Sequence, residues 1–213
     1  MGTCPPPLPA PRPETQSDDP VVMTPLDARK AGTRTGGASF SLTNRIFRVV
    51  WGLGWLVLAR WTPQPLHGWR RFVLRLFGAQ IGRKVRIAAS VQIWHPHNLR
   101  IDEFAIIGPQ VRLYNQGDIH IGRFAVVSQL AHICASTHDV NDRHFQIVLR
   151  PVHIEDEAWV AAEAFIGPGV RVGQGAIAGA RCVVFEDLEP WMIYRGNPGV
   201  LVKRREFRDK DEL

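Results

Sequence analysis

Aliphatic residues recur every six positions between about Ile81 and Val184. Hexads such as IGRKVR, IDEFAI and IGRFAV begin with an aliphatic residue, often continue with Gly, Ala or an acid, and have a small residue or Val fifth. An ordinary meander of strands would alternate with period two and show hairpin turns, and this segment does neither. A short strand and a tight turn make one side of a triangular coil, and three sides return the chain one strand spacing higher. The pattern predicts an all-β fold, a left-handed parallel β-helix over residues 81–190.

The aliphatic residues that begin successive coils are Ile81, Ile101, Ile121, Ile154 and Val172. Their spacings are 20, 20, 33 and 18 residues. Three hexads make 18 residues, so the first two coils each contain an inserted dipeptide. The third coil is 13 residues longer than the two before it, which predicts a loop at residues 139–151.

The chain on either side of the repeat has a different character. Residues 1–40 are rich in Pro, Gly, Ser and Thr without an apolar period, which predicts a disordered tail. Residues 41–80 form a helical lead-in, in which the first stretch, Leu42–Ala59, is strongly apolar. In its second stretch, His67–Phe77, helical spacing gathers Trp69, Phe72, Val73 and Leu76 on one face and leaves Arg70, Arg71 and Arg75 off it. Residues 191–213 are expected to be a C-terminal segment with a charged tail.

The helical lead-in has two interpretations. Four of the seven tryptophans lie between Trp51 and Trp69, and apolar helices with Trp and Arg are typical of a segment lying in a membrane interface. The same helices could instead cap the repeat or pack against a neighbouring subunit. The uncharged stretch Val49–Ala59 has eleven residues, well short of the roughly 20 needed to span a bilayer.

Charge is distributed unevenly along the chain. No Asp or Glu occurs between Asp27 and Asp102, whereas thirteen of the 26 Lys and Arg residues do. Such a block favours an anionic neighbour, such as a phospholipid surface, an acidic glycan or a phosphorylated ligand. No zinc finger, helix-turn-helix or RNA-binding motif accompanies the charge, so we expect no nucleic acid partner.

The three cysteines, Cys4, Cys134 and Cys182, are too few and too scattered for a disulfide framework or a zinc site. Cys134 and Cys182 occupy apolar repeat positions and are expected to be small core residues. The N-terminus has no signal-peptide layout, so we expect a cytoplasmic protein, peripheral at the inner membrane face if the lead-in binds lipid. The final residues, 210–213, spell KDEL, an endoplasmic-reticulum retrieval signal that we interpret as a charged tail.

Three further stretches carry a family resemblance. They are PLHGWRRFVLRLFGAQIG before the repeat, STHD at residues 136–139, and the closing RGNPGVLVKRR. Together with the hexads they resemble the hexapeptide-repeat acyltransferases, in the branch of galactoside, maltose, nodulation-factor and colanic-acid acetyltransferases, the last being most similar. The resemblance covers about Leu42 to Arg205. It implies a homotrimer in which acetyl-CoA and the acceptor meet between neighbouring prisms.

The resemblance assigns catalytic roles to His138 and Asn115. Acetyl transfer from a thioester to an alcohol needs a base for the hydroxyl proton and donors for the oxyanion, and histidine is the usual base near neutrality. His138 matches the family's catalytic histidine and stands where the predicted loop leaves the coil. Asn115 resembles the acceptor-side asparagine, although a corner asparagine is also explained by left-handed backbone. Asp139 could orient the imidazole.

The resemblance also implies a cofactor surface. The residues that match the acetyl-CoA surface are Trp159, Ala161, Gly179 and Ala180. Lys203, Arg204 and Arg205 could meet the nucleotide phosphates, or they could be a solvated basic tail. The family's lysine in a Val-Thr-Lys-Asp stretch is Glu186 here, which would repel a phosphate.

The sequence therefore favours an O-acetyltransferase that moves acetyl from acetyl-CoA to a hydroxyl of a free or lipid-linked sugar. The expected context is exopolysaccharide or glycolipid biosynthesis, and the expected mechanism is direct transfer in a ternary complex. Alternatives are a xenobiotic acetyltransferase, a metal-dependent enzyme like the carbonic-anhydrase relatives of this coil, and a non-catalytic scaffold. His132 lies one hexad before His138, but equivalent positions in successive hexads face different sides of the triangle. We therefore expect no metal.

Overall fold

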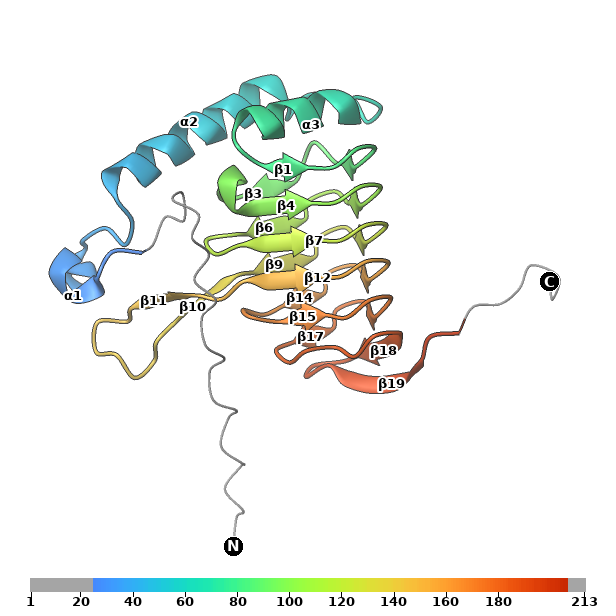
Figure 1. Cartoon of the computed structure of the whole chain (residues 1–213). Coiled ribbons are helices and arrows are strands. Elements are labelled where there is room, and N and C mark those ends of the chain that lie inside the picture. The colour runs from blue at the N-terminus through green and yellow to red at the C-terminus, as the bar shows by residue number, and fades with distance from the viewer. Residues whose placement is uncertain (1–24, 207–213) are drawn as a thin grey trace, which may run out of the picture.

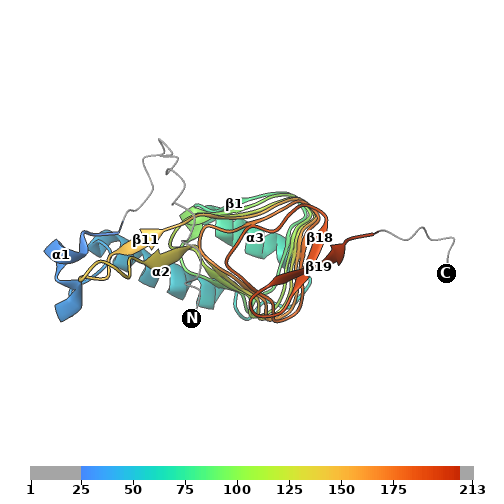
Figure 2. The same ribbon diagram turned by 90° about the horizontal axis from the view of Figure 1, so that it is seen from below.

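The computed structural model describes residues 25–206 as a triangular prism with helices across one end (Figure 1). Seen along its axis, the prism has three flat faces and stacked corners (Figure 2). The left-handed parallel β-helix expected from the hexads is confirmed, as is the helical segment before it. The expected disorder of residues 1–24 and the charged tail from residue 207 lie outside the described residues.

Three sheets of parallel coil strands form the faces of the prism. The first sheet contains β1 (Gln80–Ile81), β4 (Leu99–Ile101), β7 (Ile119–Ile121), β12 (Val152–Ile154) and β15 (Arg171–Val172). The second contains β2 (Arg86–Ile87), β5 (Ile106–Ile107), β8 (Val126–Val127), β13 (Trp159–Val160), β16 (Ile177–Ala178), β18 (Met192–Arg195) and the antiparallel β19 (Val200–Arg204). The third contains β3 (Gln92–Ile93), β6 (Arg112–Tyr114), β9 (His132–Cys134), β14 (Phe165–Ile166) and β17 (Val183–Val184). A 3-10 turn, η2 (Pro96–Asn98), follows β3.

The strand register reproduces the coil lengths read from the sequence. Ile101 pairs with Ile81 and with Ile121, and Ile154 pairs with Ile121 and with Val172. These side chains stack inside the prism and are at most 6% exposed. The 13 extra residues of the third coil therefore leave the ladder without shifting its register.

One corner of the prism turns through left-handed backbone in residues other than glycine. Lys84, Phe104, Phe124 and Glu157 stack on successive coils with φ between 56° and 64°. Such backbone costs about 1–3 kcal/mol per residue in general. From the second coil on, the corner amide donates to a carbonyl of the coil before it, as Phe104 N does to Arg83 O at 3.1 Å and Phe124 N to Glu103 O at 3.2 Å. The stacking of coils thus holds a conformation that the residue types disfavour.

Helices α2 (Leu42–Leu58) and α3 (His67–Leu76) cover the first coil. Trp51 and Trp55 of α2 are buried, and Trp51 Nε1 donates to Ile93 O at 2.8 Å. From α3, Val73 and Leu74 are buried in the same core. The inner faces of both helices therefore seal the end of the prism.

Helix α3 turns most of its apolar face outward. Arg70 is fully buried, whereas Trp69, Phe72 and Leu76 are 41–65% exposed. The guanidinium faces inward because carbonyls converge there: Nε donates to Ile87 O at 2.7 Å and Nη2 donates to Gln64 O at 2.6 Å. Arg70 lies off the apolar face, as helical spacing predicts, but on the side of α3 that packs against the prism.

Residues 25–40, which composition assigns to the tail, contain α1 (Ala28–Ala31) and a 3-10 helix, η1 (Thr33–Thr35). Asp27 Oδ1 caps α1 by accepting from Arg29 N at 2.9 Å and Lys30 N at 3.1 Å. The predicted loop is also more regular than expected. It is a hairpin of two antiparallel strands, β10 (Ser136–His138) and β11 (Ile147–Leu149), that projects sideways from the prism (Figure 1). The excursion therefore begins three residues earlier than predicted.

Candidate active site

The hairpin places His138 at the end of β10, where it pairs with Ile147 of β11. Asp142 orders the turn between the strands, because Oδ1 accepts from His144 N at 3.0 Å and Oδ2 accepts from Gln146 N at 3.2 Å. Asp139 N donates to Gln146 O at 2.8 Å. His138 is exposed to solvent on this ordered arm.

The imidazole of His138 has one fixed and one open nitrogen. Its Nδ1 lies 2.7 Å from Phe145 O. A carbonyl oxygen only accepts hydrogen bonds, so Nδ1 carries the proton and Nε2 of the neutral ring is left as a base. Asp139, expected to orient this ring, instead accepts from Asn141 N at 2.9 Å through Oδ1. The backbone of Phe145 takes the orienting role, which side-chain patterns do not reveal.

Asn115 lies on the neighbouring coil with its amide fully buried. Oδ1 accepts from Trp94 N at 3.0 Å and from His95 N at 3.2 Å, and Nδ2 donates to His95 O at 2.5 Å. Its amide closes the turn after β3, which gives Asn115 a structural role. The expected catalytic role of Asn115 stays a prediction.

Tyr114 is an active-site candidate that the sequence reasoning passed over. It pairs with Cys134 on the next coil, and Cys134 precedes His138 by four residues. Its hydroxyl accepts from Gln116 Nε2 at 2.8 Å, and burial raises the pKa of the phenol above its usual value. Cys134 is half-buried on this outer surface and donates to Ser136 O at 3.2 Å, so its expected core position was wrong. The strand alternation, with Ile133 pointing inward, was the available signal.

A segment far away in sequence holds the hairpin. Gln146 Oε1 accepts from Ala28 N at 2.6 Å, and its Nε2 donates to Leu26 O at 3.2 Å. Thr33 Oγ1 donates to His144 O at 3.2 Å. The N-terminal segment therefore braces the arm that carries His138, and the sequence analysis missed it because it placed residues up to 40 in the tail.

The residues expected to meet acetyl-CoA gather at another corner of the prism. Trp159 and Ile177 pair on β13 and β16, and Ala161 N donates to Ala178 O at 2.8 Å. This places Ala161 next to Gly179, with Ala180 exposed beside them. The Trp159 ring is 43% exposed, and its Nε1 donates to Ser128 Oγ at 2.9 Å.

The basic residues of β19 lie at the end of the same sheet. Lys203 and Arg204 are exposed and pair with Ile193 and Met192 of β18. Arg205 differs from them, because its Nη1 donates to Glu157 O at 3.0 Å and Gly175 O at 2.9 Å. Those contacts hold Arg205 against the last coils, and its expected contact with a phosphate stays a prediction.

The hairpin and the Trp159 corner lie on opposite sides of one chain. The hairpin leaves between the third and first sheets, whereas β13 and β19 belong to the second, and the view along the axis separates them clearly (Figure 2). A single chain therefore does not bring His138 to the residues expected to bind the donor.

Relatives of known sequence identify the family. No protein-family model matches the chain. The chain is 42% identical over 156 residues to WcaF of Escherichia coli strain K12, which is assigned as a colanic acid biosynthesis acetyltransferase. The match covers 72% of this chain and 86% of the relative. The chain belongs to the hexapeptide-repeat acetyltransferases.

Solved structures show the same fold. A maltose O-acetyltransferase from Clostridium difficile 630 aligns with 78% of this acetyltransferase and 90% of its own chain, at a TM-score of 0.70 and 21% identity. A hexapeptide-repeat acetyltransferase from Vibrio cholerae in complex with acetyl-CoA aligns with 78% and 91%, at a TM-score of 0.70 and 19% identity.

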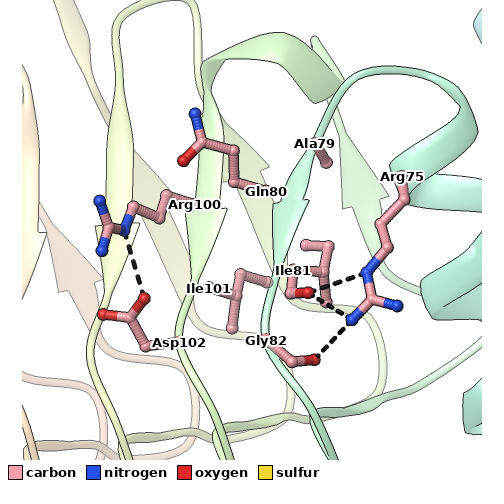
Figure 3. Close-up of a pocket in the computed structure, with 8 residues that line it drawn as sticks. All are labelled: Arg75, Ala79, Gln80, Ile81, Gly82, Arg100, Ile101 and Asp102. Carbon is pink, nitrogen blue, oxygen red and sulfur yellow. Dashed lines mark hydrogen bonds and ion pairs between the residues drawn. The ribbon is translucent and has the colours of Figure 1, made fainter.

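Two further observations concern other sites on this acetyltransferase. Within residues 25–206, no three His, Cys, Asp or Glu side chains are placed to hold a metal ion. A shallow cavity of about 460 Å³ opens beside β1 and β4 (Figure 3). Its two arginines are engaged, Arg75 with Ile81 O and Arg100 with Asp102. The cavity lies at the first two coils, whereas the hairpin follows β9 of the third. We assign it no part in the site.

Proposed function

We propose that this acetyltransferase moves the acetyl group of acetyl-CoA to a hydroxyl of a sugar during exopolysaccharide or glycolipid assembly, with His138 as general base. The single observation that carries the proposal is the hydrogen bond from His138 Nδ1 to Phe145 O, which leaves Nε2 as an exposed base. The relative assigned to colanic acid biosynthesis and the fold shared with a maltose O-acetyltransferase support a saccharide acceptor. The fold shared with an acetyl-CoA complex supports the donor.

The proposed reaction is a direct transfer in a ternary complex. His138 Nε2 takes the proton of the acceptor hydroxyl as its oxygen attacks the thioester carbonyl. The tetrahedral intermediate collapses with breakage of the carbon–sulfur bond, and the imidazolium returns the proton to the leaving thiolate of coenzyme A. The Phe145 carbonyl stabilises the imidazolium that forms between the two steps, because it accepts from Nδ1 in both protonation states.

The donor is proposed to lie at the Trp159 corner, with its pantetheine against the small residues Ala161 and Gly179. Lys203 and Arg204 would face the nucleotide phosphates, since both are exposed on the same sheet. The hairpin and this corner are separated within one chain, so the proposal places the site between neighbours in a homotrimer. The cytoplasmic side of the membrane is the proposed location, because acetyl-CoA is the donor.

Replacement of His138 tests the chemistry. His138→Ala should lower acetyl-CoA-dependent thiol release in the presence of a saccharide acceptor by about 10²–10⁴-fold, the usual contribution of a general base. His144→Ala is the matched control, because His144 lies on the same hairpin and its backbone N and O make hydrogen bonds there that the substitution keeps. Full activity of His138→Ala would show that the proposed mechanism is wrong.

Mixed oligomers test the intersubunit site. At low acetyl-CoA, His138→Ala should be nearly inactive and Trp159→Ala about tenfold less active than wild type. Co-refolded mixtures should exceed the activity of either variant, because some interfaces combine two intact surfaces. A site within one chain gives no recovery.

An acceptor panel of free sugars, lipid-linked oligosaccharides and small aromatic alcohols separates saccharide transfer from xenobiotic acetylation.

A further inference from the structure

The outer face of α2 is apolar along its whole length, although it points away from the prism. Six of its residues are 52–63% exposed, namely Ile46, Val49, Val50, Leu53, Leu56 and Val57. The opposite face carries the buried Trp51 and Trp55. A helix that is apolar on both faces needs an apolar environment on both sides. The prism supplies only one of them.

Aromatic residues extend this surface at the end of α2. Trp61 is 72% exposed, and Trp69 and Phe72 of α3 contact each other with ring centroids 5.5 Å apart. The indole N–H of Trp61 donates to Val57 O at 2.5 Å, and that of Trp69 donates to Leu58 O at 2.6 Å. Both rings therefore present carbon faces outward while their polar atoms are satisfied. This suits the boundary between water and lipid.

The charge around the surface has one sign. Between Ser41 and Gln80 the chain contains six arginines and no Asp or Glu. Arg45 and Arg60, both exposed, lie near the two ends of α2, and the outer face between them has no charged residue. An anionic surface complements this arrangement, because each basic residue close to anionic lipid contributes about 1 kcal/mol.

We propose that the outer face of α2, continued by Trp61, Trp69 and Phe72, docks this acetyltransferase on an anionic phospholipid bilayer, with α2 parallel to the membrane plane. The helix has 17 residues, and no helix within residues 25–206 has the length and hydropathy to cross a bilayer. A helix that lies in the interface buries one face in lipid and leaves the other for the protein. Here the protein-facing side is the one that seals the prism.

A second copy of the chain is a poorer occupant of this surface. Pairing two caps would bring Arg45 and Arg60 of one copy toward the arginines of the other, with no carboxylate between Asp27 and Asp102 to offset them. The cap also lies at the end of the prism axis (Figure 1), whereas side-by-side prisms meet along their walls. In a rotationally symmetric trimer of parallel prisms all three caps would face the same plane. One flat bilayer could therefore contact them together.

Vesicle co-sedimentation of the full chain tests the docking surface. We expect binding to vesicles of equal parts phosphatidylglycerol and phosphatidylcholine, and much weaker binding to pure phosphatidylcholine. The double variant Leu53→Asp, Val57→Asp should weaken binding at least about tenfold, because two side chains lose their transfer into lipid. Phe124→Asp is the matched control, since Phe124 is 50% exposed on a corner of the prism wall. Arg45→Gln with Arg60→Gln should weaken binding to the anionic vesicles alone, by about fivefold for each arginine.

Two further readouts keep the proposal falsifiable. Circular dichroism should show that the Asp variants fold. Brominated lipid should quench the tryptophan fluorescence of the wild-type chain, and it should quench that of the double variant Trp61→Phe, Trp69→Phe much less. Absence of vesicle binding by the folded wild type overturns the proposal, as does equal weakening by Phe124→Asp. A smaller oligomer for the Leu53→Asp, Val57→Asp variant in analytical ultracentrifugation, with unchanged vesicle binding, would assign the surface to a second copy. None of these results depends on acetyl transfer, so the docking surface and the proposed function fail separately.

Discussion

The stability of the prism should depend on pH through His95, which lies at the first coil beneath α2. Its side chain is fully buried, and neither ring nitrogen has a hydrogen-bond partner. The ring packs against Phe47 and Trp94, with centroids 4.7 Å and 5.9 Å away. Burial, followed by the charges of His97 and Arg48, lowers the pKa of His95 from 6.5 to about 4. Protonation in the folded state would place a charge among aromatic rings without a partner.

The direction of the effect follows from proton binding in the two states. In the unfolded chain His95 takes up a proton below its ordinary pKa of 6.5, whereas the folded chain resists it down to a pKa of about 4. The unfolded state is therefore favoured progressively as the pH falls through this window. One pKa unit corresponds to about 1.4 kcal/mol, so the full shift amounts to about 3 kcal/mol of unfolding free energy.

Urea unfolding at a series of pH values between 7.5 and 4 measures this loss. The variant His95→Phe keeps an aromatic ring in the site and cannot be protonated. Between pH 7.5 and 4 its unfolding free energy should therefore fall by about 3 kcal/mol less than that of wild type. The remaining pH dependence should come from other histidines with lowered pKa values, such as His132 and His153. Parallel curves for wild type and His95→Phe would refute the assignment of the effect to His95.

Three other substitutions separate structural from catalytic roles. Asn115→Ala should destabilise the fold by about 3 kcal/mol in urea, because buried donors in the Trp94–His95 backbone lose their acceptor. An unchanged urea midpoint with a large loss of kcat would instead show a catalytic role. Gln146→Ala should lower kcat about tenfold at unchanged KM for acetyl-CoA, because the hydrogen bond from Ala28 that holds the hairpin is lost. Asn141→Ala is the control on the same hairpin. Equal kcat values for Gln146→Ala and wild type would contradict the bracing role. Trp159→Ala should raise KM for acetyl-CoA about tenfold with a smaller effect on kcat, and a KM equal to that of wild type would remove Trp159 from the donor surface.

The sequence determined the prism because the repeat acts at short range. Each hexad contains its own inward side chain and its own turn, so the spacing of Ile101, Ile121 and Ile154 already specified which strands pair. The same arithmetic isolated the excursion with His138 at its base. The family could also be recognised from the sequence, because the stretches that carry the resemblance, such as STHD, are contiguous in the chain.

Only the tertiary structure decided the surroundings of the site and the cap. Residues 25–40 resemble a tail by composition, and they become ordered through contacts of Ala28 and Thr33 with a hairpin more than 100 residues away. Asn115 matches a catalytic pattern, and only the structure shows that its buried amide also holds the backbone at Trp94 and His95. Helical spacing put the arginines of α3 off its apolar face, and Arg70 points inward because carbonyls from two other segments, Pro63–Gln64 and Ile87, meet there. In a repeat, local spacing determines which strands become neighbours. The contacts of residues 25–40, Asn115 and Arg70 depend instead on which distant backbone groups converge, and no local sequence pattern encodes that.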